Sequence, residues 1–315
     1  MSLLFYIGLQ TPYILVKILK LQKVREKTMK YLYLFIPAIG WGLMPLVIAS
    51  VKKSTVYNQI VGTVAASFIF GALVMLIMHP AISWSLFLLS ALGGALWVVG
   101  QVGQYISYAR IGVSETMPIS TGLQLIGVPL VGVIAFGEWA TNQAKVWGFL
   151  GILVLIVGVV FTSLTDKGTA EGNKNNQVST IILLVLTTLG YVASSSIPKA
   201  LHGSGVSIFF GQTVGMLVAV FVYTLVTGNI KSWTEKATFQ SGLAGILYSV
   251  AALAYILSVQ ANGVNMAFVI SQLCVVISTL GGLIFLHEKK TQKGLIFTIL
   301  GLVLIIAGAV MTTLF

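Results

Sequence analysis

Charged side chains are scarce in this sequence. Asp, Glu, Lys and Arg make up only 8% of its 315 residues, whereas an average soluble domain contains about 25%. Hydrophobic residues make up 57%, and the mean hydropathy is +1.00. Such a composition excludes an ordinary soluble domain and predicts an all-α integral membrane protein.

Cysteine, histidine and acidic residues are also few. The single cysteine, Cys274, lies within an apolar stretch, so an internal disulfide is excluded. The three histidines stand apart and show no metal-ligand spacing, so we expect neither a metal site nor a cofactor. Only seven Asp and Glu residues occur, nearly all in loops, so few carboxylates are available for catalysis within the membrane. The sequence therefore disfavours an enzyme.

The formal net charge of +11 does not indicate nucleic-acid binding. The basic residues are scattered over short loops, where anionic lipid headgroups favour them. From Met29 onward they are concentrated in the loops on one side, which places both chain termini outside by the positive-inside rule. The basic residues at 17–27 weaken this bias. The expected partner is therefore the lipid bilayer and not a nucleic acid.

Ten apolar stretches are each long enough to cross a bilayer, which takes about 20 residues per helix. The predicted spans are residues 31–50, 57–78, 84–108, 114–137, 146–164, 179–199, 205–227, 239–260, 264–286 and 294–314. Residues 1–28 combine a short apolar part with a basic run and resemble neither a signal peptide nor a full span. We expect them to be an N-terminal extension outside the fold.

The ten spans divide into two similar halves. Residues 29–164 and 179–315 hold five spans each, and the polar residues 165–178 read as a linker. Gly137-Glu138 after the fourth span matches His287-Glu288 after the ninth, 150 residues later. Because five is odd, the second half enters the membrane from the opposite face. The sequence therefore predicts two five-helix inverted repeats, an arrangement that many carriers use.

The stretch from Gly112 to Trp139 is apolar enough to span the membrane, yet it carries polar groups at its centre. Ser120, Thr121 and Gln124 lie there, with prolines at 118 and 129. Polar groups inside a bilayer usually face protein or a wet cavity. These side chains either line a ligand site or join packed helices. In the ninth span Ser271 and Gln272 are comparable but the prolines are absent, so we expect more ligand contacts in the first half.

This stretch resembles a known family. The sequence Gly-Val-Ser-Glu-Thr-Met-Pro-Ile-Ser-Thr-Gly-Leu-Gln-Leu, ending in Gly-Glu-Trp, is similar to the glucose/ribose porter family of the drug/metabolite transporter superfamily. Supporting motifs are Pro37–Pro45, Tyr57–Thr63 and Gly100–Gln104. The resemblance covers Met29 to the C-terminus. It implies ten helices and uptake of a monosaccharide across the plasma membrane, with coupling to protons and glucose as the first candidate. Ten-helix members of the superfamily can work alone, so we expect a monomer.

A sugar site needs fixed hydrogen-bonding groups and an aromatic surface for the ring. The third span offers both on one helical face, since Gln101, Gln104, Tyr105 and Tyr108 follow i, i+3, i+4, i+7 spacing. Trp97 lies one turn earlier. The two glutamines either line a cavity or bond to a neighbouring helix. Tyr105 and Tyr108 approach the end of the span, where we expect them in the interfacial aromatic belt.

The first and sixth spans contain residues that can interrupt a helix. Gly40, Gly42 and Pro45 occur in the first, and Ser194–Ser196 with Pro198 in the sixth. Matched interruptions in two halves often mark a central binding site. The neighbouring aromatic residues Trp41 and Tyr191 then become candidates for stacking on the ligand, the alternative being packing around a kink. Gln212 in the seventh span lies within a Gly-xxx-Gly helix-packing motif and is a weaker candidate.

Ion coupling has few candidate groups. No Asp or Glu lies at the centre of a span. Glu115, which opens the fourth span, is the best candidate for proton coupling, and diffusion without coupling is also compatible. We expect Glu138 and Glu288 to be structural, paired at the surface with Lys145 and Lys289.

The sequence supports a secondary carrier that imports a monosaccharide by alternating access. An exporter of drugs or metabolites from the same superfamily is an alternative. An intramembrane enzyme or a lipid-linked sugar translocase is an alternative of another class. A membrane scaffold is disfavoured, because buried Gln101, Gln104 and Gln124 would then have no use.

Overall fold

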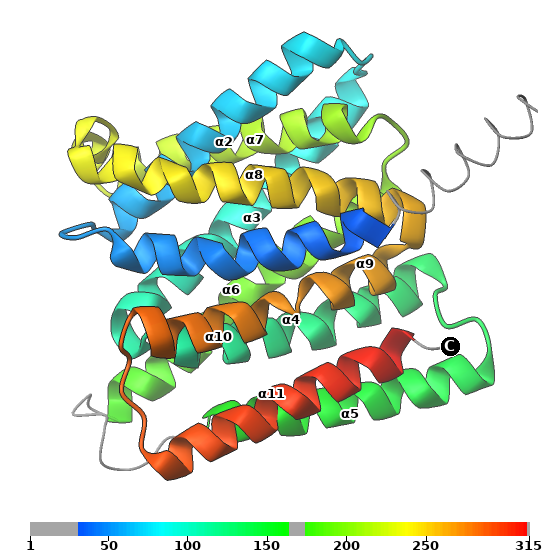
Figure 1. Cartoon of the computed structure of the whole chain (residues 1–315). Helices are drawn as coiled ribbons and strands as arrows, with labels where there is room; N and C mark the ends of the chain where they lie inside the picture. Colours follow the sequence, from blue (N-terminus) through cyan, green and yellow to red (C-terminus); the bar gives the residue numbers. More distant parts are fainter. Residues whose placement is uncertain (1–30, 164–173, 314–315) are drawn as a thin grey trace, which may run out of the picture.

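The computed structural model describes residues 31–163 and 174–313. The expected extension at residues 1–28 and the linker up to residue 173 lie outside the described residues. Within the described part, ten helices are long and apolar enough to cross a membrane. The prediction of an all-α membrane protein with ten spans is confirmed (Figure 1).

The first span is the helix Tyr31–Ser50. The later helices are α2 (Val56–Met78), α3 (Trp84–Ile111), α4 (Val113–Phe136), α5 (Asn142–Ser163), α6 (Lys174–Ala200), α7 (Gly205–Val226), α8 (Lys236–Asn262), α9 (Val264–Ser271), α10 (Cys274–Phe285) and α11 (Gln292–Thr313). A short 3-10 helix, η1 (Ile230–Thr234), precedes α8. Helix α6 thus begins inside the stretch that was predicted to be linker.

Local sequence explains where several helices begin and end. A capping box formed by Thr55 and Asn58 begins α2, and the Ser83 side chain caps α3. Helices α3 and α8 end at Gly112 and Gly263, which have φ angles of 80° and 85°. Because L side chains rarely adopt such angles, glycine allows the chain to turn directly into the next helix.

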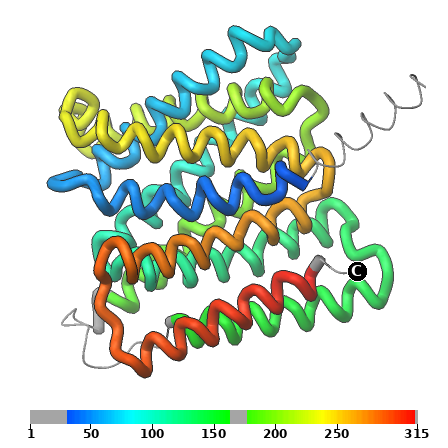
Figure 2. Tube along the Cα trace, in the orientation of Figure 1, coloured from blue at the N-terminus to red at the C-terminus, as the bar shows by residue number. Residues whose placement is uncertain are grey.

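Two hydrophobic cores hold the helices together. One packs residues of α2, α3, α7 and α8, and the other packs residues of α4, α9, α10 and α11. Trp41 and Tyr108 contact both cores. Helices α5 and α11 pair at one side of the bundle, where Gly151 and Gly158 approach the backbone of α11 closely (Figures 1 and 2). The region shared by the cores is therefore the centre of the molecule.

The first and sixth spans are continuous helices, so the predicted interruptions there are wrong. Gly40 and Gly42 serve close packing instead. A Cβ atom on Gly40 would lie 2.8 Å from the Ala251 Cβ, and one on Gly42 would lie 2.7 Å from the Ile277 Cβ. These glycines let the first helix settle between α8 and α10.

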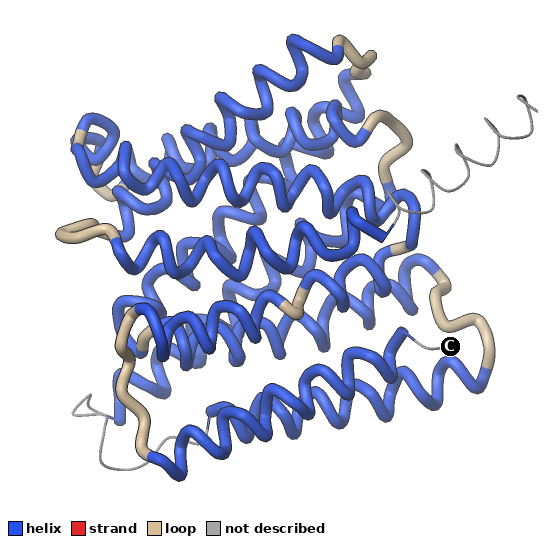
Figure 3. The backbone as a smooth tube through the Cα atoms, in the orientation of Figure 1, coloured by secondary structure: helices blue, strands red, loops and turns tan. Residues whose placement is uncertain are grey.

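The interruption occurs in the ninth span, between α9 and α10 (Figure 3). The Ser271 Oγ donates to the Phe268 carbonyl at 2.6 Å, and the Gln272 N–H lies 3.0 Å from the Phe268 carbonyl and 3.2 Å from that of Val269. Such shared bonds mark a turn tightened towards 3-10 geometry. The chain therefore turns more sharply at Gln272 than a regular α-helix does.

Candidate functional site

A cavity of about 80 Å³ lies at the centre of the bundle. A buried water needs roughly 15 Å³ of such space, so the cavity has room for several waters or a small polar ligand. Roughly half of its lining comes from each half of the chain. The lining residues are Trp41, Met44, Pro45, Trp97, Gln101, Gln104, Tyr108, Met117, Thr121, Gln124, Tyr191, Ser194, Ser195, Gln212, Tyr248, Ala252, Tyr255, Ile256, Phe268, Gln272 and Cys274.

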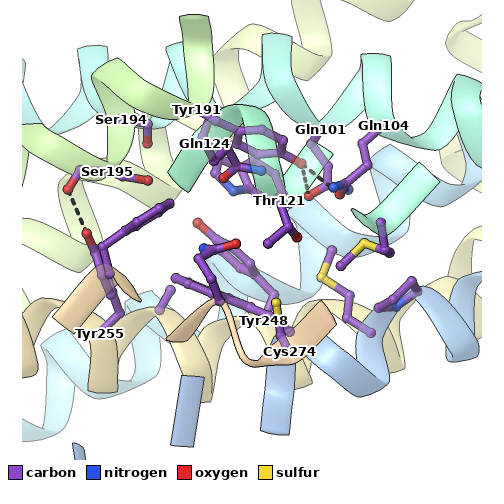
Figure 4. Close-up of a pocket in the computed structure, with 18 of the residues that line it drawn as sticks. Gln101, Gln104, Thr121, Gln124, Tyr191, Ser194, Ser195, Tyr248, Tyr255 and Cys274 are labelled. Atoms are coloured by element: carbon purple, nitrogen blue, oxygen red, sulfur yellow. Dashed lines mark hydrogen bonds between the residues drawn. The ribbon is translucent and has the colours of Figure 1, made fainter. Parts of the chain in front are cut away.

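A hydrogen-bond network joins α3, α4 and α6 along one wall of the cavity (Figure 4). The Tyr191 hydroxyl lies 2.8 Å from the Gln101 Oε1 and 3.0 Å from the Gln104 Oε1. The Gln104 Nε2 donates to the Ser120 Oγ at 2.9 Å. The Gln124 Nε2 lies 3.2 Å from the same Ser120 Oγ. Because each member fixes the next, the amides hold set directions towards the cavity.

Aromatic rings form two further surfaces. The rings of Trp97 and Tyr248 lie 4.4 Å apart between centroids, which joins α3 to α8. The rings of Trp41 and Tyr255 lie 5.3 Å apart, which joins the first helix to α8. The Tyr255 hydroxyl donates to the Ser195 carbonyl at 2.9 Å (Figure 4). Rigid rings of this kind suit the apolar face of a sugar ring.

Several polar groups at the cavity have no hydrogen-bond partner among the described residues. They include the side chains of Thr121, Gln212 and Gln272, and the buried indole Nε1 of Trp41. Buried polar groups in native proteins are normally paired. Groups left open around a cavity can therefore bond to a ligand or to water.

No charged side chain occurs among the residues that line this cavity in the described part of the chain. Its polar groups are amides, hydroxyls, indoles and one thiol, and aromatic and aliphatic side chains make up the rest. Such a lining favours a neutral polyhydroxylated ligand. A carboxylate or a phosphate would lose its water without gaining an opposite charge.

Most of the predicted site residues meet at the cavity. Its lining contains Trp41, Trp97, Gln101, Gln104, Thr121, Gln124, Tyr191 and Gln272. Ser120 is fully buried behind the wall, where it bonds to the glutamines. Their roles towards a ligand stay predictions.

Two tyrosines were placed wrongly by the sequence reasoning. Tyr105 is fully buried and bonds to the Thr63 Oγ1 at 2.9 Å, and Tyr108 lines the cavity. Both side chains face the protein interior, so neither belongs to an exposed aromatic belt.

Residues of α8 were missed. Tyr248, Ala252 and Tyr255 follow i, i+4, i+7 spacing and so share one helical face. This spacing was the available signal. Both halves supply similar shares of the lining, and the expectation of more ligand contacts in the first half stays a prediction.

The carboxylates lie away from the cavity. Glu115 accepts a hydrogen bond from the Gln177 Nε2 at 2.7 Å near the start of α4. The neighbouring Lys290 donates to the Thr298 Oγ1 at 2.7 Å. Burial lowers the pKa of Lys290, and the negative charges of Glu115 and Glu288 partly oppose that shift. Glu115 is therefore part of a charged group that joins the two halves.

Glu138 and Glu288 do not pair with Lys145 and Lys289 as predicted. Each carboxylate accepts two backbone N–H groups at the start of a helix in the other half of the chain. Free N–H groups in the first helical turn are strong partners for a carboxylate, which explains the preference.

Comparisons with known proteins bear on what this cavity serves. A family model described as "Sugar transport protein" matches residues 32–315. The chain belongs to this sugar transport family. It is therefore a multi-pass membrane transporter for sugars and not an enzyme.

Relatives agree with this assignment. A protein of Lactobacillus johnsonii that is named as a sugar uptake protein is 84% identical, over 91% of this chain and 100% of its own length. One from Lactobacillus helveticus, named in the same way, is 42% identical over 89% of this chain and 99% of its own. One from Staphylococcus epidermidis, named as a ribose uptake protein, is 37% identical over 88% of this chain and 95% of its own.

A solved crystal structure of another protein is similar in fold. It has a TM-score of 0.67 and 13% identity, and the match covers 91% of this chain and 97% of that one. At this identity the likeness concerns the arrangement of helices alone.

Proposed function

We propose that this sugar transporter imports a neutral monosaccharide, with glucose as the first candidate, and that the ligand occupies the central cavity. The observation that carries the proposal is the uncharged lining. Gln101, Gln104 and Gln124 offer oriented amides, while Trp41 and Trp97 belong to the two aromatic surfaces. Ribose is the second candidate, since one relative is named for its uptake.

Transport by alternating access fits the position of the cavity. It lies where the two hydrophobic cores meet, and both halves of the chain supply its walls. The proposed inverted repeat is supported by matched features, since Gly112 and Gly263 turn in the same way before α4 and α9. Rocking of one half against the other would expose the cavity to each side in turn. A monomer suffices for this motion.

Coupling to protons would use Glu115. Its carboxylate is partly buried at the start of α4, beside Gln177 of α6 and close to Lys290. A buried carboxylate can bind and release a proton as its surroundings change. In this proposal Glu115 binds the proton and the central cavity binds the sugar.

The test is uptake of radiolabelled glucose into proteoliposomes that contain the full chain, with and without an imposed proton gradient. Accumulation above equilibrium only with the gradient is expected. Unlabelled glucose and ribose should compete, whereas glucose 6-phosphate should not, because the lining holds no cation. Failure of every neutral monosaccharide to enter would overturn the proposal.

Coupling is tested separately with Glu115→Gln. This variant should equilibrate glucose yet fail to concentrate it. Glu235→Gln is the matched control, because that carboxylate precedes α8 outside the cavity and bonds to Asn58. If Glu115→Gln still concentrates glucose, the proton uses another route.

A further inference from the structure

Two carboxylates join the halves of the chain in the same manner at two places. Glu288, in the loop after α10, lies 2.7 Å from the Val113 N and 2.8 Å from the Ser114 N at the start of α4. Glu138, in the loop after α4, lies 3.1 Å from the Val264 N and 3.0 Å from the Asn265 N at the start of α9. Each half therefore supplies one carboxylate to the other half.

The surrounding backbone is built for this contact. Glycines lie against both carboxylates, since a Cβ atom on Gly132 would be 3.1 Å from the Glu138 Oε2 and one on Gly282 would be 3.0 Å from the Glu288 Oε2. A larger residue would crowd the carboxylate at either place. Two N–H groups bound to one carboxylate form charge-assisted bonds that are stronger than ordinary ones.

The two contacts lie at opposite ends of the bundle. Helix α4 begins at the Glu288 contact and ends just before Glu138, and it crosses the whole molecule between them (Figure 1). The central cavity lies between these ends and is lined by α4, α9 and α10. Both contacts are formed in this structure, in which Cys274 of the cavity is only 3% exposed.

We infer that Glu138 and Glu288 are two latches between the halves, and that the cavity opens to one side of the membrane when the Glu138 latch breaks and to the opposite side when the Glu288 latch breaks. The inference rests on the proposed alternating access. Separating the halves at either end pulls a carboxylate from its helix N-terminus. The latches are thus positioning groups that touch no ligand.

The latches are not equal in strength. The Glu288 latch has the shorter bonds, and Lys290 and Glu115 surround it with further charge. The corresponding positions near Glu138 are Ala140 and Met266.

The Asn265 side chain adds to this difference. It is buried beside Glu138, and neither its Oδ1 nor its Nδ2 has a hydrogen-bond partner among the described residues. The Glu138 end therefore opens more readily than the Glu288 end.

Cys274 provides the readout, because it is the only cysteine in the chain and lines the cavity. The experiment labels the full chain with a membrane-impermeant maleimide in vesicles of each orientation. Glu138→Gln should raise the labelling rate from one side by about tenfold, and Glu288→Gln should do so from the other, since loss of a charge-assisted bond changes an equilibrium by roughly that factor. Unaltered protein should label slowly from both sides, and faster from the Glu138 side.

Matched controls remove a charge at the same ends without touching a latch. Lys145 and Lys289 are exposed in the structure. Lys145→Gln and Lys289→Gln should therefore label like the unaltered chain. Cys274→Ser should not label at all. Glu138→Asp and Glu288→Asp, which shorten the latch by one methylene, replace the Gln variants if those fail to fold.

The result that overturns the inference is faster labelling from the same side in both latch variants, or no change in folded latch variants relative to the lysine controls. Labelling needs no sugar and no proton gradient. Failure of glucose uptake with opposite-sided labelling would therefore reject the proposed substrate and keep the latches. Glucose uptake with unchanged labelling would keep the substrate and reject the latches.

Discussion

Helices α4 and α9–α10 follow corresponding turns at Gly112 and Gly263, yet one span is a continuous helix and the other is broken. Helix α4 contains Pro118 and Pro129 and is continuous, whereas the α9–α10 span contains no proline and is broken at Gln272. Proline can be accommodated in membrane helices when neighbouring groups satisfy the freed carbonyls. Proline content is therefore a poor guide to where this transporter interrupts a helix.

Chain length explains the break better. The second half has one residue fewer between Gly263 and Gly282 than the first has between Gly112 and Gly132. One missing residue turns the rest of an α-helix by about 100°. A turn tightened towards 3 residues, as seen at Gln272, regains much of that rotation and keeps Cys274 facing the cavity.

The two spans also use an equivalent serine differently. Ser120 bonds across helices to the amides of Gln104 and Gln124, whereas Ser271 bonds back to the Phe268 carbonyl of its own helix. The first serine holds a wall together and the second helps to bend a helix. Serine at corresponding positions therefore joins helices in one span and bends the helix in the other.

The largest effect is expected when the length difference is removed. An alanine inserted between Gln272 and Leu273 gives the ninth span the length of α4 and rotates α10 by about 100°. Cys274 then takes the place of the fully buried Val275 and turns away from the cavity, so glucose uptake in proteoliposomes should be lost and labelling of Cys274 by the impermeant maleimide should fall. An alanine inserted between Lys52 and Lys53, in an exposed loop, is the control. Normal uptake by the ninth-span insertion would contradict the length argument.

Replacing the two serines should give the next largest difference. Ser120→Ala leaves the Gln104 Nε2 buried without its acceptor, which costs about 1–3 kcal/mol. Its Tm and its apparent affinity for sugar should both fall. Ser271→Ala removes only a bond within its own helix and should leave the Tm nearly unchanged. Equal losses of Tm in detergent for the two variants would show that the serines are equivalent after all.

A smaller effect is expected at the equivalent pair Thr121 and Gln272, which both line the cavity without a hydrogen bond to the described residues. Thr121→Val and Gln272→Leu should raise the KM for sugar several-fold. Their Tm should not fall, because no protein partner is lost. A loss of Tm comparable to that of Ser120→Ala would show that these side chains hold the fold and not the ligand.

The smallest effect concerns pH at the Glu288 end. Burial lowers the pKa of Lys290 below 10.5, so a rise in pH towards that value removes its charge in the folded protein first. The unfolded chain binds more protons in this window, so this lysine makes stability rise with pH there. Its loss of charge also leaves Glu115 and Glu288 without their cation and weakens the Glu288 latch.

The measurement is the ratio of the Cys274 labelling rates from the two sides of the membrane. A ratio is needed because the thiol reacts faster at high pH from either side, and this common increase cancels. The ratio should shift a few-fold towards the Glu288 side in the unaltered chain and stay constant in Lys290→Met. A shift of the same size in both proteins would show that another group titrates.

The sequence was sufficient for the spans and for eight of the 21 residues that line the cavity. Apolar stretches locate the helices. Gln101 and Gln104 indicate a polar wall, because burying an amide in a bilayer costs free energy. It could not place Tyr248 or Tyr255, whose spacing is equally compatible with ordinary packing. It also misassigned Glu138 and Glu288, because their partners are backbone groups in the other half, which no local pattern reveals.

The wall formed by Tyr191, Gln101, Gln104 and Ser120 satisfies most of its own hydrogen bonds before any ligand arrives. A transporter that works by alternating access must also return to its starting conformation without sugar. Unpaired polar groups in an interior without water would make that step slow. Because this wall keeps its bonds when empty, and water can bond to the open groups of Thr121, Gln212 and Gln272, the protein without sugar should change conformation readily. We therefore expect net filling of empty vesicles rather than strict one-for-one exchange of sugars.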